Sequence, residues 1–196
     1  HVVGQGKAQG ARSAGTRAFW SPGSGRAFVG ALSLSSLACL SAWAQPAATA
    51  LPTGGNVAVG AASISSVGAA MAIRQGSDRA VINWQSFNIG KDASVSVVQP
   101  GSQSVLLNRV TGESPSQIFG QLSANGQVVL INPNGMIFGK DGSVSAAGFT
   151  ASTLGMTDAN FMSGNMVYER NGSTAGIVNQ GRISTQGGYV ALLGAS

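Results

Sequence analysis

Short apolar runs, broken by turn residues, dominate the chain from Leu51 onward. Apolar and polar residues alternate over four to seven positions, and pairs such as Asn125-Gly126 and Asp141-Gly142 end the runs. This pattern is typical of strands separated by tight turns. Only Ser66–Ile73 has the composition of a short helix, but it contains a glycine and lacks an acidic first turn, so a strand is favoured there as well. The pattern predicts an all-β chain.

The clearest element signals lie between Val128 and Thr153, where the order strand, turn, strand, turn, strand is expected. Val128–Ile131 has no polar face, which favours a strand that is covered on both sides, as in parallel sheets. In the following Asn132–Gly135, proline fixes φ and pushes the preceding residue towards an extended conformation. The Asn-Gly pair tolerates positive φ, so a sharp bend is expected between two strands.

Two architectures fit short strands of this kind. A sandwich or barrel of antiparallel strands would use two-residue hairpins, whereas a solenoid would stack short strands from similar units. Residues 176–193 favour the solenoid, because their strands of three to five residues alternate with Asn/Gln-Gly and Gly-Gly corners and are too short for an isolated hairpin. With about 20 to 25 residues per rung, residues 45–196 would form roughly six or seven rungs.

Composition first suggests, and charge distribution then excludes, a nucleic-acid binder. The formal net charge is +5, while only 9% of residues are charged. Most of the excess positive charge lies before residue 45, where there are four basic residues and no acidic one. From residue 45 onward, basic and acidic residues are nearly equal in number and form no basic cluster. The four residues are Lys7, Arg12, Arg17 and Arg26.

The first 44 residues have the layout of a secretory signal peptide with a long basic n-region. An uncharged apolar run, Ala27–Ala44, ends in small residues, so cleavage is expected after Ala44, with Ala50 as a second candidate. A membrane anchor is the weaker alternative, because four serines dilute the run and no charged stop follows it. Cys39, the only cysteine, fits a lipid-attachment motif poorly. Because Cys39 lies before the expected cleavage site, the mature chain would lack cysteine and disulfides.

No catalytic, cofactor or metal site is expected. Glycoside hydrolysis needs two carboxylates across a cleft, and none of the six acidic residues lies in a catalytic motif. The single histidine, His1, lies before the apolar run of the predicted signal peptide and would be removed with it, so the mature chain offers no Ser-His-Asp triad and no ordinary zinc ligands. A polysaccharide-cleaving β-helix enzyme is the distant alternative, and no small-molecule substrate is expected.

Six segments follow one another in a specific order and spacing: Val81–Gly90, Leu106–Gly112, Ser116–Gly120, Gly126–Gly139, Phe149–Thr153 and Asn179–Ile183. Through them the chain from Leu51 to Ser196 resembles the N-terminal two-partner secretion domain of the filamentous haemagglutinin family. Two departures stand out: Met136 replaces the isoleucine of the family's Asn-Pro-Asn-Gly-Ile, and its earlier Asn-Pro-Asn-Leu motif is absent, Gln99–Ser102 being the nearest turn.

The resemblance implies a right-handed single-stranded parallel β-helix over residues 45–196 that continues in a larger exoprotein. It implies export by the signal peptide, recognition by the periplasmic domains of a cognate outer-membrane transporter, and folding outside a Gram-negative cell. In this interpretation the domain is a secretion-targeting and folding-template unit of an adhesin-type exoprotein, secreted or held at the cell surface. A stand-alone adhesin that binds host glycans or proteins is the alternative.

The resemblance also indicates candidate site residues. Asn132, Pro133, Asn134, Gly135 and Met136 form the candidate secretion motif, in which a structural turn is favoured over direct contact with the transporter. Asn108 and Arg109 are either transporter contacts or corner residues, because asparagine at a β-helix corner commonly binds backbone groups. Trp84, Phe87, Phe119 and Phe138 are expected in the core, with Tyr189 as a further member.

Overall fold

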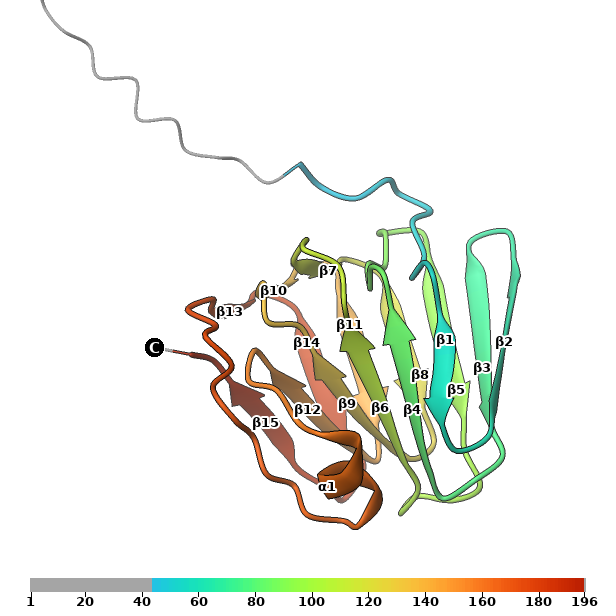
Figure 1. The fold of residues 1–196 in the computed structure, drawn as a ribbon. Helices are drawn as coiled ribbons and strands as arrows, with labels where there is room; N and C mark the ends of the chain where they lie inside the picture. The colour runs from blue at the N-terminus through green and yellow to red at the C-terminus, as the bar shows by residue number, and fades with distance from the viewer. Residues whose placement is uncertain (1–43, 196) are drawn as a thin grey trace, which may run out of the picture. The chain divides into compact units, whose positions relative to one another are not determined.

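The computed structural model describes residues 44–195, which form a parallel β-helix (Figure 1). The coil forms three sheets, in which parallel strands of successive rungs pair with one another. Sheet 1 contains β1 (Asn56–Val59), β4 (Arg79–Trp84), β6 (Val105–Val110), β9 (Gln127–Ile131), β12 (Gly148–Ser152) and β15 (Val190–Leu193). Sheet 2 contains β7 (Ser116–Ile118), β10 (Met136–Phe138) and β13 (Ile177–Asn179). Sheet 3 contains β2 (Ala62–Val67), β3 (Ala70–Gln75), β5 (Ser94–Val98), β8 (Gln121–Ala124), β11 (Ser143–Ala146) and β14 (Arg182–Thr185).

The register gives the length of a rung. In sheet 1, Val105 pairs with Gln127 and Gln127 with Gly148, so these rungs are about 22 residues long, within the expected range. The prediction of six or seven rungs is wrong, because only β4, β6, β9, β12 and β15 run parallel in this sheet. The first two strands turn back antiparallel, and residues 153–176 leave the coil between β12 and β13.

One end of the β-helix is closed by the antiparallel strands β1 and β2. They pair with β4 and β3 respectively, and Val57 and Ile64 pack against the core from this end. The segment Ser66–Ile73 is extended, as predicted, but it forms parts of two strands. Gly68, with φ of 57°, makes the reversal between them.

Alternate residues of the strands fill the interior. Trp84 and Phe87 meet edge to face, with ring centroids 5.6 Å apart, as do Phe138 and Phe149 at 5.9 Å. All four rings are at most 1% exposed. The core prediction is therefore confirmed for three of its four aromatic residues; Phe119 is only half-buried, against Gly139 at a corner. Tyr189 is 49% exposed and is not a core residue.

The outer face of sheet 1 carries a second apolar cluster. Residues 153–176, named the strap here, include the helix α1 (Asp158–Met162), which lies in front of sheet 1 in Figure 1. Met156 and Phe161 of the strap cluster with outward side chains of β4, β6 and β9. Val128–Ile131 is thus covered on both sides, as predicted, although one cover is the strap. Over residues 44–195, no helix has the length and apolar character needed to cross a membrane.

Candidate functional site

The candidate secretion motif, Asn132–Met136, joins β9 to β10 and is the turn that the sequence predicts. The Gly135 N–H donates to the Asn132 carbonyl oxygen at 3.1 Å, and the Asn134 N–H donates to Asn132 Oδ1 at 2.9 Å. Gly135 has φ of 101°, a conformation that favours glycine. The motif therefore moves the chain from sheet 1 to sheet 2.

Asn132 connects this turn to both neighbouring rungs. Its Nδ2 donates to the Ser114 carbonyl oxygen at 3.0 Å and to Ser116 Oγ at 2.9 Å, while its backbone N–H donates to the Ser152 carbonyl oxygen at 3.0 Å. The side chain is fully buried, so the amide has no surface with which to meet a partner in the folded domain. Met136 is buried in the core as well. These contacts make Asn132 and Met136 structural residues of the folded domain.

The accessible part of the motif borders an apolar groove. Pro133 and Asn134 are half-buried, and Asn134 Nδ2 donates to the Gly112 carbonyl oxygen at 2.8 Å. The groove has a volume of about 310 Å³ and lies over β10 and β13, with Pro115, Ile137 and Val178 among its lining residues. Asn134 is therefore accessible to a partner of the folded domain from this groove.

Replacing Gly135 by alanine is expected to lower the free energy of unfolding by about 1–3 kcal/mol, because φ of 101° is strained for any residue with a Cβ atom. The added methyl group would also lie 3.1 Å from the Gly176 carbonyl oxygen. Urea unfolding of the purified domain measures the loss. Gly172→Ala is the control, since its φ of 76° is also positive but its surroundings are open. A smaller loss at Gly135 than at Gly172 would contradict this account.

Asn108 and Arg109 are not corner residues, because both lie inside β6. The corner alternative rested on the tendency of asparagine at β-helix corners to bind backbone groups. Asn108 faces the interior, where its Oδ1 accepts a hydrogen bond from Trp84 Nε1 at 3.0 Å. Its Nδ2 is buried and has no hydrogen-bond partner among residues 44–195. The indole N–H is the group that makes an asparagine tolerable at this buried position.

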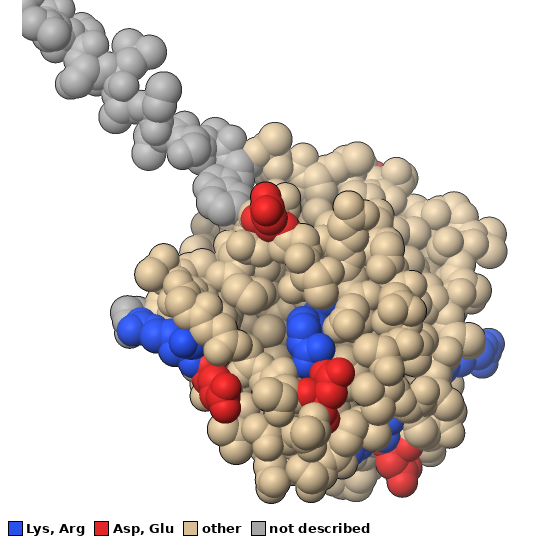
Figure 2. Space-filling model, viewed as in Figure 1, with Lys and Arg blue, Asp and Glu red and all other residues tan. Residues whose placement is uncertain are grey.

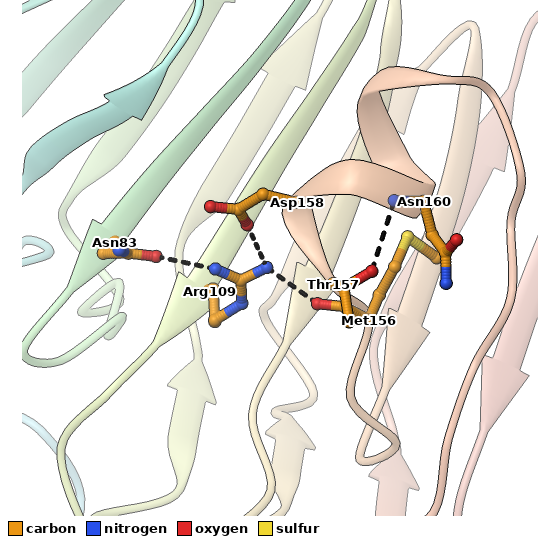
Figure 3. Close-up of polar contacts among 6 residues, drawn as sticks. All are labelled: Asn83, Arg109, Met156, Thr157, Asp158 and Asn160. Carbon is orange, nitrogen blue, oxygen red and sulfur yellow. Dashed lines mark hydrogen bonds and ion pairs between the residues drawn. The ribbon is translucent and has the colours of Figure 1, made fainter.

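Arg109 faces the opposite way and holds the strap to sheet 1 (Figure 3). Its Nη2 donates to the Met156 carbonyl oxygen at 2.8 Å and to Asp158 Oδ1 at 2.6 Å, while Nη1 donates to Asn83 Oδ1 at 3.2 Å. Thr157 caps α1 by accepting from the Asn160 N–H at 3.2 Å. The guanidinium thus connects two adjacent strands to the start of α1.

Arg79 makes a second attachment between sheet 1 and the strap. Its Nη1 donates to the Phe161 carbonyl oxygen at 3.0 Å, and its guanidinium lies 5.3 Å from the centroid of the Phe161 ring. Burial raises the pKa of Tyr168, a strap residue at the edge of the same cluster, above its ordinary 10.0. Sequence reasoning missed the strap, although Thr157-Asp158 is a helix-start signal and the strap lacks the strand alternation found around it.

The charged groups form no recognisable catalytic or metal-binding arrangement in the described part of the chain. No three His, Cys, Asp or Glu side chains of residues 44–195 come together in a way that could hold a metal ion. On the face shown in Figure 2, blue and red side chains are few and scattered. Lys91 and Asp92 form an exposed ion pair at 2.7 Å. The predicted signal peptide, residues 1–44, and Cys39 lie outside the described residues apart from Ala44.

Comparison with known proteins places this geometry in a family. The Heme/hemopexin-binding protein of Haemophilus influenzae strain Rd is 46% identical over 103 residues, which cover 53% of this chain and 11% of that protein. A second Haemophilus influenzae protein of the same name is 48% identical over 83 residues, covering 42% of this chain and 9% of its own length. The chain therefore spans about a tenth of these relatives.

The crystal structure of the HMW1 secretion domain from Haemophilus influenzae is similar in fold and in sequence. The TM-score is 0.66 at 38% identity, over 72% of this chain and 38% of that one. The profile of the TPS secretion domain family matches residues 48–196. The β-helix, its turn motif and these matches lead to one conclusion: the chain belongs to the TPS secretion domain family.

Proposed function

We propose that this domain presents an exoprotein to the periplasmic domains of its cognate transporter and then serves as a template for the folding of the exported chain. The secretion role itself follows from the family, which is one of exoprotein secretion domains and not of enzymes. The family also implies an outer-membrane transporter as partner and a route through the periplasm of a Gram-negative bacterium.

The apolar side chains exposed on β15 are the observation that supports a template. β15 is the last strand of sheet 1, at the end opposite β1 and β2. Val190 and Leu192 are 44% and 41% exposed, although their partners on β12, Phe149 and Ala151, are core residues. A further rung stacked on this end would bury them, as rungs do in a solenoid.

Secretion with and without the transporter tests the targeting role. The chain is expressed beside its cognate transporter, and the protein that reaches the medium is measured for the native sequence and for a deletion of residues 106–139. We expect secretion of the native chain only when the transporter is present, and none of the deletion. Unchanged secretion of the deletion, or secretion without the transporter, would reject targeting by this domain.

The template is tested separately in the complete exoprotein. The double substitution Val190→Asp/Leu192→Asp should leave export intact but lower the protease resistance of the exported region that follows the domain. Val178→Asp is the control, because Val178 lies on the same end rung but faces outward, being paired with the half-buried Ile137. Equal protease resistance of the double variant and the native protein would reject the template.

Signal-peptide cleavage after Ala44 is favoured over cleavage after Ala50, because residues 47–50 belong to the fold. The Gly90 N–H donates to the Ala50 carbonyl oxygen at 2.9 Å, and the Asp92 N–H donates to the Ala48 carbonyl oxygen at 2.8 Å. At Gly90 any Cβ atom would meet the carbonyl oxygens of Ala47 and Ala48, so the site is shaped for this segment. We expect the secreted domain to begin at Gln45. Mass spectrometry of its N-terminal peptide checks this, and a start at Leu51 would contradict it.

A further inference from the structure

Three asparagine residues of the chain are each followed directly by glycine. Such a pair is chemically labile, because glycine has no Cβ atom to hinder the approach of its backbone nitrogen to the asparagine side chain. Attack of that nitrogen on the asparagine Cγ forms a C–N bond, breaks the Cγ–Nδ2 bond and closes a five-membered succinimide. The side-chain nitrogen leaves as ammonia with the glycine N–H proton, and water then opens the ring to aspartate or isoaspartate. The pairs are Asn125-Gly126, Asn134-Gly135 and Asn171-Gly172.

The fold holds Asn134-Gly135 in an arrangement that opposes this reaction. The Gly135 N–H donates to the Asn132 carbonyl oxygen at 3.1 Å, so the attacking nitrogen is occupied. Asn134 Nδ2 donates to the Gly112 carbonyl oxygen at 2.8 Å and to Asn132 Oδ1 at 3.2 Å, so the amide is held as well. Both groups must leave these partners before the nitrogen can reach the Asn134 Cγ. Reaction in the folded domain therefore requires a local opening of the turn.

Asn125-Gly126 is held by a single residue of the neighbouring rung, Gln99. The Gln99 backbone N–H donates to Asn125 Oδ1 at 2.7 Å, and Asn125 Nδ2 donates to the Gln99 carbonyl oxygen at 2.8 Å. The Gly126 N–H donates to Gln99 Oε1 at 3.0 Å. Gln99 is itself buried, so these hydrogen bonds are shielded from water. At this corner, too, both the attacking nitrogen and the amide are occupied.

Asn171-Gly172, near the end of the strap, has open surroundings instead. Both residues are exposed. A Cβ atom added to Gly172 would meet nothing within 4 Å, so no neighbouring group packs on the glycine side of the pair. Within residues 44–195, one Asn-Gly pair thus remains open to the reaction while two are closed by hydrogen bonds. The open pair provides an internal comparison for the other two.

We propose that Asn125 and Asn134 are deamidation sites of the unfolded chain only, and that reaction at Asn134 before folding weakens the fold. An ionised aspartate side chain only accepts hydrogen bonds. At position 134 it would place a negative oxygen against the Gly112 carbonyl oxygen, to which Nδ2 now donates. Isoaspartate would add a main-chain atom and displace Gly135 from its hydrogen bond with Asn132. A chain that is exported before it folds therefore has a limited time in which to reach its folded state.

Peptide mapping by mass spectrometry measures the three reactions in the purified chain, incubated in mildly alkaline buffer with and without urea. In urea that unfolds the chain, the three pairs should react at rates within about threefold of one another, since none is then held by the fold. In the native chain Asn171 should keep its unfolded rate within about threefold, whereas Asn125 and Asn134 should react at least about a hundredfold more slowly, because opening must precede attack. Equal rates for Asn134 and Asn171 in the native chain, or no reaction of Asn134 in urea, would overturn the proposal.

Asn134→Asp tests the consequence for the fold, with Asn171→Asp as the matched control. Asn134→Asp should lower the midpoint of urea unfolding or abolish folding, and Asn171→Asp should leave the midpoint unchanged. The native sequence gives a second measurement after incubation in urea and dilution into buffer. Chains modified at position 134 should be depleted about tenfold from the folded fraction on size-exclusion chromatography, because a buried hydrogen bond has lost its donor, and chains modified at position 171 should not.

Equal midpoints of the two variants, or equal recovery of the two modified forms, would overturn the effect on the fold. No transporter takes part in either experiment. The outcome is therefore independent of the secretion function, and a failure of the targeting role would leave it untouched.

Discussion

Replacing Asn132 by alanine is expected to lower the free energy of unfolding by about 3 kcal/mol and to reduce secretion sharply. The substitution removes hydrogen bonds to the Ser114 carbonyl oxygen, to Ser116 Oγ and from the Asn134 N–H. A buried polar group that loses its partner costs about 1–3 kcal/mol, and the Asn132 site is fully buried. Urea unfolding of the purified domain gives the stability loss, and protein in the medium gives the secretion.

Pro133→Ala separates folding from recognition in the same turn. Pro133 is half-buried and only its backbone oxygen is bonded, to Ser173 Oγ at 2.7 Å, so the substitution should change stability by less than about 1 kcal/mol. If the motif acts through the fold, the Pro133→Ala chain is secreted normally. A Pro133→Ala chain that folds normally and stays inside the cell would instead show direct contact between the turn and the transporter.

Replacing Trp84 by alanine is expected to cost about 3–5 kcal/mol, because it opens a cavity among core side chains. It also removes the hydrogen bond from Trp84 Nε1 to Asn108 Oδ1. Trp84→Phe keeps much of the packing but leaves the Asn108 side chain unpaired, so about 1–3 kcal/mol is expected. Asn108→Leu leaves the indole N–H unpaired and should cost a similar amount.

The double variant Trp84→Phe/Asn108→Leu tests whether the pair acts as a unit. Since both polar groups are then gone, its loss should be smaller than the sum of the two single losses, by about 1–2 kcal/mol. Urea unfolding of the four proteins provides the cycle. Additive losses would contradict the account of Asn108 as a polar residue that is tolerated because of Trp84.

The features that the sequence predicts are those with local causes. Proline, asparagine and glycine determine the turn at Asn132–Gly135 through their own backbone preferences, and the structure places it between the expected strands. Val128–Ile131 likewise has no polar residue, which predicts burial on both sides, and all four side chains are buried. Short runs and regular corners then suffice to predict a solenoid and its approximate rung length.

The features that it does not predict depend on contacts between distant residues. Arg109 binds Asp158, which is 49 positions away, and no local pattern connects the two. The direction in which Asn108 points follows from the register of β4 with β6, which places Ile82 beside it and Trp84 within reach. Antiparallel pairing of the first strands also lowers the rung count and has no local signal, whereas the strap lowers it with only the helix start at Thr157-Asp158 and a loss of strand alternation as signals.

The strap also affects how the domain unfolds. In a solenoid each repeat normally contacts only its neighbours, so the array can open one repeat at a time from an end. Here one segment contacts side chains from three successive strands, β4, β6 and β9, through Met156 and Phe161. These rungs cannot separate singly without exposing the shared cluster. The strap therefore makes a linear array behave as a cooperative unit, and the rungs it covers should exchange their amide hydrogens together and more slowly than β13–β15.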